Sequence, residues 1–305
     1  MIQFVVLGLI PKFPVLRARC IFDPEVLVDI SRQLEFPGPH GCEQADRFSL
    51  ILHDVRIGGT WKRTNRGRLR STEEMLCAHV APALRNGLTF LDMGASDGIT
   101  TVDALRVLRH AFGECVTALL ADINLSLLRY RWGPIIEYRG GDGEAIMVRL
   151  GRVGVRLARQ RHEQHANNWF NQQYLRMKRL RRSMHAEAPI SLVHPLARRE
   201  PGIAVIKLNC LTHAACLNGR FGAIRASNVL NLDYFDSAQL YKAVGNLHLY
   251  MRDGGCLVVS RNQDERGREL ENGSVWVKDG GRFRWVADFG GASEIKSIVD
   301  RWPGR

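Results

Sequence analysis

A carboxylate followed by a glycine-flanked turn is the feature of this chain best suited to bind a ligand. Thr89–Met93 has the composition of a buried strand, Asp92 lies at its end, and Gly94–Gly98 leads into a helix. A strand that delivers a ligand to a helix N-terminus is a common way to build a nucleotide-like site. The glycines have GxxxG spacing, whereas a dinucleotide site needs closely spaced glycines that let backbone approach a pyrophosphate. The spacing and the acid therefore favour a ligand that lacks phosphates and carries a positive centre.

Other polar residues follow apolar strands in the same way. The pattern predicts a strand at Val116–Ala121 that ends at Asp122, and another at Phe221–Ala226 that is followed by Asn228. Strands that alternate with helices form parallel sheets, whose carboxyl ends share one edge. We therefore expect these side chains to meet at that edge.

Four segments, taken in order, resemble the motifs of class I S-adenosylmethionine (SAM)-dependent methyltransferases. They are the glycine-rich Leu91–Gly98, Leu119–Ile123 with its strand-end acid, the fourth-strand segment Phe221–Leu230, and Leu249–Val259, which enters the fifth strand. The resemblance covers residues 71–135 and 200–305. It implies an enzyme of the α/β class with SAM as cofactor. It also implies a seven-stranded, mostly parallel sheet with an antiparallel C-terminal hairpin and helices on both faces.

The resemblance also implies roles for particular residues. Asp92 would bind the methionine amino group, Asp122 the ribose hydroxyls and Ile123 the adenine ring. Asn209 would bind the adenine amino group, and the glycines would let the turn pass close to the ligand. Asp97 and Gly98 could instead form only a turn, and Asp122 could be a helix cap. The implied cofactor-binding residues are Asp92, Gly94, Ala95, Ser96, Asp97, Gly98, Asp122, Ile123, Asn209 and Cys210.

Asn228 and Tyr234 are the candidate catalytic residues, because both follow the fourth strand. Asn228 would orient the substrate, or would only cap the following turn. Tyr234 is a candidate base for a protonated acceptor. The stretch Arg225–Phe235 is similar to one in chemoreceptor glutamate methyltransferases, but two residues separate Arg225 from Asn228. Carboxyl methylation is therefore not carried over.

The sequence suggests an N-terminal extension at 1–70, a methyltransferase domain at 71–134 and 190–305, and an inserted basic cap at 135–189. About 80 residues separate the second strand from the third, too many for a simple connection. We expect three short strands in this insertion, at 135–139, 144–150 and 154–157, and a helix at Ala166–Met184. Further expectations are a helix that begins at Asp23-Pro24, a strand at Ser49–Ile57 and a helix at Asn124–Tyr130.

The net charge of +12 is concentrated in two segments. Residues 149–182 hold ten Lys or Arg and one acid, and Lys62–Arg70 holds five basic residues. Such a run is a solvated helix face, a site for an anionic substrate or partner, or a surface that contacts a membrane. The expected acceptor is a small or glycan-like molecule. The alternatives are an RNA methyltransferase and a non-catalytic module that binds an acidic partner or a membrane surface.

The seven cysteines are scattered and contain no CxxC pair, so the sequence signals neither a zinc site nor a disulfide framework. The histidines likewise offer no metal-binding spacing. No apolar run approaches the length that spans a bilayer. These features favour a cytoplasmic protein that has no metal and no transmembrane segment.

Overall fold

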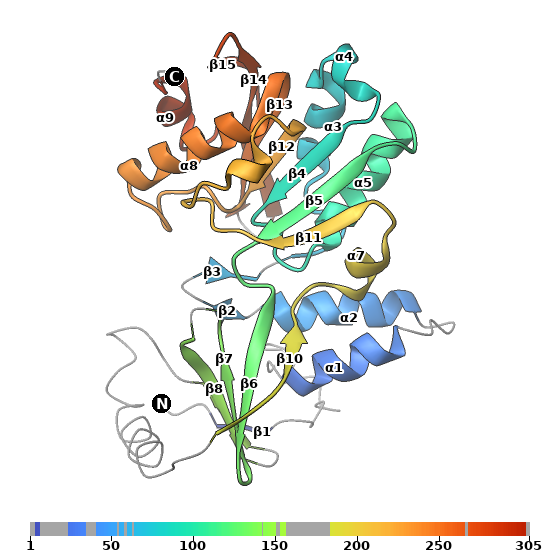
Figure 1. The fold of residues 1–305 in the computed structure, drawn as a ribbon, viewed down its shortest axis with the longest axis vertical. Coiled ribbons are helices and arrows are strands. Elements are labelled where there is room, and N and C mark those ends of the chain that lie inside the picture. The colour runs from blue at the N-terminus through green and yellow to red at the C-terminus, as the bar shows by residue number, and fades with distance from the viewer. Residues whose placement is uncertain are drawn as a thin grey trace. The chain divides into compact units, whose positions relative to one another are not determined.

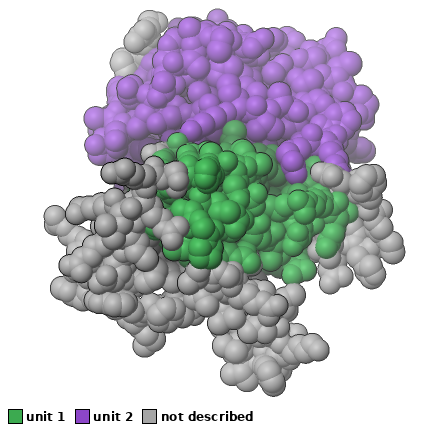
Figure 2. Space-filling view, turned by 60° about the horizontal axis from the view of Figure 1, so that its bottom comes forward, with its two compact units in different colours: residues 1–63, 124–195 green, residues 64–123, 196–305 purple. Residues whose placement is uncertain are grey.

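The computed structural model describes residues 4–6, 24–34, 41–53, 55–57, 60–62, 64–141, 143–150, 153–156, 184–265 and 268–302. The chain forms two compact units (Figure 2): Met1–Arg63 with Asn124–Pro195, and Thr64–Ile123 with Leu196–Arg305. We call them unit 1 and unit 2. Within the described residues, no helix is both long enough and apolar enough to span a membrane.

Unit 2 contains a seven-stranded mixed sheet in the order β11-β5-β4-β12-β13-β14-β15 (Figure 1). The first five strands are parallel, and β14 runs antiparallel to both β13 and β15. The predicted α/β class and antiparallel C-terminal hairpin are confirmed. The strands are β4 Thr89–Met93, β5 Thr117–Asp122, β11 Ile203–Lys207, β12 Phe221–Ser227, β13 Met251–Glu265, β14 Arg268–Asp279 and β15 Arg282–Phe289.

Helices cover both faces of this sheet, because its central strands carry apolar side chains in both directions. Leu91 and Ile224 pack on the face covered by α8 (Ser237–Tyr250) and α9 (Lys296–Asp300). Phe90 and Ala223 pack on the opposite face, which is covered by α3 and α5. The remaining helical elements of unit 2 are α3 Arg70–His79, α4 Pro82–Arg85, α5 Ile99–Phe112, α7 Pro195–Arg199, which begins at the boundary of unit 1, and the 3₁₀ turn η2 Ala215–Leu217.

Unit 1 is built on an antiparallel sheet of six short strands in the order β1-β9-β8-β7-β6-β10. The predicted strands of the insertion are present as β7, β8 and β9. Glu25 ties helix α1 to this sheet, because its carboxylate accepts hydrogen bonds from Arg129 Nη1 and Tyr138 Oη. The elements are β1 Phe4–Val6, α1 Pro24–Gln33, α2 Gly41–His53, β2 Arg56–Ile57, β3 Thr60–Trp61, β6 Ser126–Trp132, β7 Ile135–Arg139, β8 Ala145–Leu150, β9 Val153–Arg156 and β10 His185–Ser191.

Two secondary-structure predictions in unit 1 are wrong. The helix expected at Asn124–Tyr130 is strand β6, which pairs with β7 on one side and β10 on the other. The strand expected at Ser49–Ile57 is mostly helix α2, in which Phe48, Ile51 and Leu52 are buried at helical spacing. The helix expected at Ala166–Met184 lies outside the described residues, except for Met184.

The compact units also divide the chain differently from the domains expected from the sequence. Strand β1 pairs with β9, and Phe4 lies opposite Val155. The N-terminal segment and the insertion therefore contribute to one sheet. The unit boundaries follow residues 63, 123 and 195, whereas we expected boundaries after 70, 134 and 189.

Candidate functional site

The candidate site lies at the carboxyl edge of the unit 2 sheet. The chain runs outward from β4 through β5 to β11, and then returns to β12 on the other side of β4. Ligands of open α/β sheets bind outside the carboxyl ends of the strands at such a reversal. Asp92 and Asp122 lie at the ends of β4 and β5, and Asn228 directly follows β12.

The turn after β4 is fastened over the end of β5. The backbone N–H groups of Gly94 and Ala95 donate to the carbonyl of Ala121, at 2.8 and 3.2 Å. The N–H of Ser96 donates to Asp122 Oδ2 at 2.8 Å. Ser96 has a φ of 61°, which is rare for a residue with a side chain. The structure therefore brings the predicted turn and the second strand-end acid into direct contact.

An apolar surface lies next to Asp122. Ile123 is 39% exposed, although it directly follows a buried strand. Leu208 N donates to the carbonyl of Asp122, which places the segment after β11 beside this position. Asn209, in that segment, accepts a hydrogen bond from Leu211 N on its Oδ1 at 2.9 Å. The segment that holds Asn209 thus lies beside the end of β5.

Cys210 is part of the protein core. Its side chain is buried in the cluster beneath α8, and burial raises the pKa of its thiol to about 11. Its carbonyl accepts a hydrogen bond from Asn246 Nδ2. These contacts give Cys210 a packing role at the end of β11.

Asp92 has protein partners on both carboxylate oxygens. Arg225 Nε donates to Oδ1 at 2.9 Å, and Arg225 Nη2 donates to Oδ2 at 2.5 Å. Thr101 Oγ1 also donates to Oδ2, at 2.6 Å. Asp92 is 2% exposed and the guanidinium of Arg225 is completely buried. The sequence predicted that Asp92 faces the ligand, but the structure directs its carboxylate into the protein.

The conformation of the glycine turn is set by the protein's own packing. Gly94 has a φ of 74°, and a Cβ there would lie 2.6 Å from Val229 Cβ. Gly98 has a φ of 86°, and a Cβ there would lie 2.0 Å from Leu120 Cδ1. The sequence predicted that these glycines make room for a ligand. At both positions protein side chains occupy the space instead.

Asp97 acts as a cap within the same turn. It is fully buried, and its Oδ1 accepts a hydrogen bond from Ile99 N at the start of α5. An Asp carboxylate often caps its own backbone two residues on in this way. This contact matches the turn-forming alternative that the sequence left open.

We predict that Gly94→Ala destabilises the protein more than Gly113→Ala does. Both glycines have positive φ, but a Cβ at Gly113 would meet nothing within 4 Å. Gly113→Ala should therefore cost only backbone strain, about 1 kcal/mol. Gly94→Ala adds the overlap with Val229, and should cost about 3 kcal/mol in total. Urea denaturation of the two variants measures the difference, and equal losses would show that Val229 yields without cost.

Asn228 links the ends of β12 and β13. Its Oδ1 accepts from Asn262 N at 2.7 Å, and its Nδ2 donates to Asn262 Oδ1 at 2.9 Å. Its φ of 59° is the second positive value among residues with side chains in the described part of the chain. Tyr234 lies farther along the same loop, half-buried against Phe235. The structure therefore gives the Asn228 amide a positioning contact at the edge where substrate orientation was predicted.

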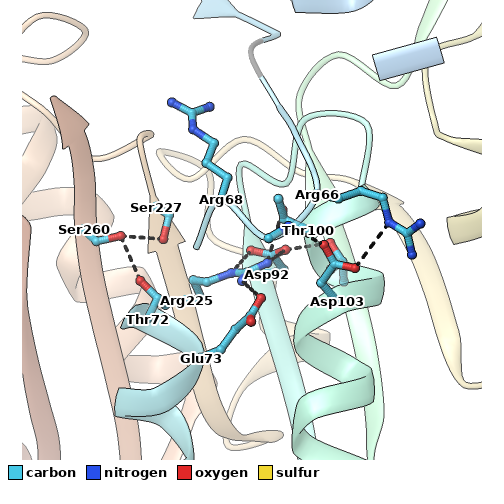
Figure 3. A network of polar contacts seen from close by, with 12 residues as sticks. Arg66, Arg68, Thr72, Glu73, Asp92, Thr100, Asp103, Arg225, Ser227 and Ser260 are labelled. Atoms are coloured by element: carbon cyan, nitrogen blue, oxygen red, sulfur yellow. Dashed lines mark hydrogen bonds and ion pairs between the residues drawn. The ribbon is translucent and has the colours of Figure 1, made fainter. Parts of the chain in front are cut away.

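Arg225 and Glu73 join Asp92 in a buried polar cluster that was not predicted from the sequence (Figure 3). Glu73 Oε1, on α3, lies 3.8 Å from Arg225 Nη1. Burial raises the pKa of Glu73 to about 7, and Arg225 only partly offsets this effect. Burial alone would lower the pKa of Arg225, but its net pKa is raised because Asp92 stabilises the charge. An arginine within the apolar strand Phe221–Ser227 was the available signal, because such a charge needs a buried partner.

A row of hydroxyl groups crosses the sheet beside this cluster. Ser227 Oγ lies 2.7 Å from Ser260 Oγ, which lies 3.1 Å from Thr72 Oγ1. Thr72 Oγ1 and Ser260 Oγ both donate to the carboxylate of Glu271. The row therefore ties the first turn of α3 to β12, β13 and β14.

Most of the predicted site residues fall into two groups. One group surrounds the end of β5: Ala95, Ser96, Asp122, Ile123 and Asn209. The other group maintains the edge itself: Asp92, Gly94, Asp97, Gly98, Cys210 and Asn228. Within the described residues, no group of three or more His, Cys, Asp or Glu side chains could hold a metal ion.

Comparisons with known proteins give only distant similarities. No protein-family model matches the sequence, and no curated protein matches it. Several solved structures are similar in fold. One is the CMeT domain of the citrinin polyketide synthase, at 17% identity and a TM-score of 0.35, with 78% of this chain and 43% of that chain covered.

Two further solved structures come from named organisms. One is a sarcosine dimethylglycine methyltransferase of Galdieria sulphuraria, described as putative, at 15% identity and a TM-score of 0.32, with 73% of this chain and 61% of that chain covered. The other is the 1,6-didemethyltoxoflavin-N1-methyltransferase of Burkholderia thailandensis with bound S-adenosylhomocysteine, at 15% identity and a TM-score of 0.34, with 78% and 70% covered. This chain thus covers less than two thirds of the polyketide synthase domain and of the Galdieria sulphuraria protein. These likenesses are too distant to assign an activity.

Proposed function

We propose that this chain is a SAM-dependent methyltransferase whose cofactor lies along the carboxyl edge of the unit 2 sheet. The arrangement of Ser96, Asp122 and Ile123 carries the proposal. A carboxylate accepts several hydrogen bonds, so Asp122 can bind ribose hydroxyls in addition to its partners within the protein. The exposed side chain of Ile123 offers an apolar surface for adenine.

The residues present fit the adenosine half of SAM, but fit the amino-acid half less well. Asp122, Ile123 and Asn209 supply an acid, an apolar face and an amide at one place. Asp92, the expected partner of the amino group, is already bonded to Arg225 and Thr101. SAM supplies the reactive methyl group when bound, and the protein's task is to position the acceptor.

The glycine turn argues against a dinucleotide ligand. A pyrophosphate requires backbone that can be approached closely. On the side where a Cβ would project, Gly94 lies against Val229 and Gly98 lies against Leu120. A ligand that binds through Asp122, at the side of the turn, is compatible with this packing.

The proposed acceptor is a small or glycan-like molecule. The alternatives, RNA, an acidic partner and a membrane surface, depend on the basic segment 149–182. Of that segment the structure describes residues 149–150 and 153–156, and its role is a prediction from the sequence. The cytoplasmic location is likewise a prediction from the sequence.

Titration calorimetry with SAM and S-adenosylhomocysteine tests the proposal. We expect Asp122→Ala to weaken binding of both by about 100-fold, because two hydrogen bonds to a charged group are lost. Asp253→Ala is the matched control, since Asp253 is an exposed acid near the start of β13. The proposal is wrong if the folded wild-type protein binds neither compound.

A further inference from the structure

We infer that Arg225 is a positioning residue for the candidate cofactor turn, and that Asp92 acts through Arg225 and does not bind the cofactor's amino group. The inference rests on the proposed function for the identity of the ligand. It differs from the role that the sequence predicted for Asp92.

The contacts of Arg225 reach both ends of the turn. Asp92 precedes the turn on β4, and the guanidinium binds it through two nitrogens. Thr100 lies in the first turn of α5, after the turn, and its Oγ1 accepts from Arg225 Nη2 at 3.3 Å. Thr101, beside it, donates to Asp92. The Asp92–Arg225 pair thus links the end of β4 to the start of α5, the two elements that the turn Gly94–Gly98 connects.

Arg225 also extends this link to neighbouring elements. It belongs to β12, where it lies in register with Asp92, and its Nη1 faces Glu73 on α3. Its guanidinium lies 5.5 Å from the ring centroid of Phe90. One buried side chain therefore contacts β4, α3 and α5, which together determine where the turn lies.

Asp92 could bind an ammonium group only by giving up its bonds to Arg225. That exchange would leave a completely buried guanidinium without its main partner, which is strongly unfavourable. Asp92 is also 2% exposed, and both of its carboxylate oxygens are bonded within the protein. The amino group must therefore find its acceptors elsewhere on the edge.

Two ligands separate the possible roles of Asp92. S-adenosylhomocysteine carries the amino group, whereas 5′-methylthioadenosine shares its adenosine part and lacks the amino acid. We expect Asp92→Leu to weaken both to a similar extent, because a misplaced turn affects the whole site. Adding Arg225→Met replaces the ion pair with apolar side chains, and should restore both affinities to within about 3-fold of wild type.

A loss of tenfold or more for S-adenosylhomocysteine alone in the double variant would show that Asp92 binds the amino group. Asp92→Asn, which keeps the size of the side chain, gives the same comparison if the double variant does not fold. In that variant the ratio of the two affinities should also stay within about 3-fold of the wild-type ratio. If wild type binds neither compound, the proposed function fails. The inferred partnership is then judged by thermal unfolding, where rescue of Asp92→Leu by Arg225→Met supports it and additive losses contradict it.

Discussion

Arg225→Met is expected to lower the free energy of unfolding by about 3–5 kcal/mol, the range measured when one partner of a buried ion pair is removed. The variant would leave the Asp92 carboxylate buried and bonded only to Thr101 among the contacts described above. Glu73 would also lose the cation that lowers its pKa. Urea denaturation followed by circular dichroism measures the loss.

The matched control for this prediction is Arg261→Met, on the neighbouring strand β13. Arg261 also has two acidic partners, Asp233 and Glu294, but its side chain is 31% exposed. Water replaces such contacts readily, so the loss should stay below about 1 kcal/mol. Similar losses for the two variants would show that burial does not distinguish the pairs. Asp92→Leu in the Arg225→Met background should recover much of the stability, because no buried charge is then left over.

Sequence patterns predict the central strands of the unit 2 sheet well, because β4, β5 and β12 are short apolar segments bounded by turns. The strand before Asp92, the strand before Asp122 and the hairpin around 279–281 all occur where the composition indicates. The pairing of Asp92 with Arg225 could not be predicted in this way. It joins residues 133 positions apart, and it depends on which strands become neighbours.

The secondary structure of unit 1 also depends on pairing between distant segments, which the local sequence does not reveal. Asn124–Tyr130 has no strong strand pattern of its own, and it becomes a strand because β7 and β10 pair with it. The preference of a segment for strand depends heavily on such neighbours. The β1–β9 pairing, which unites the N-terminal segment with the insertion, is similarly non-local.

The sequence places the glycine turn correctly, but the structure gives a different reason for its glycines. Glycine at 94 and 98 indicates a tight approach, and a tight approach is present. The sequence cannot show whether a ligand or a side chain makes that approach. Val229 and Leu120 make it here.

Glu73 should make the stability of the protein fall as pH rises from about 4.5 to about 7, relative to a variant that lacks it. Burial raises the pKa of this carboxyl from 4.5 to about 7, and the acids Asp103, Glu271 and Asp92 add to the rise. Between these values the unfolded chain releases the proton, whereas the folded protein retains it. Folding then costs progressively more, up to about 3 kcal/mol above pH 7.

Glu73→Gln removes this titration and keeps the shape of the protonated side chain. Its stability relative to wild type should therefore be lowest below about pH 4, where wild-type Glu73 is protonated in both states, and should rise by about 3 kcal/mol by pH 8. Urea denaturation of both proteins at several pH values gives this difference directly. Glu74→Gln is the control, because it makes the same chemical change at an exposed position on the same helix. A Glu73→Gln difference that does not change with pH would mean that Arg225 fully offsets the effect of burial on the pKa of Glu73.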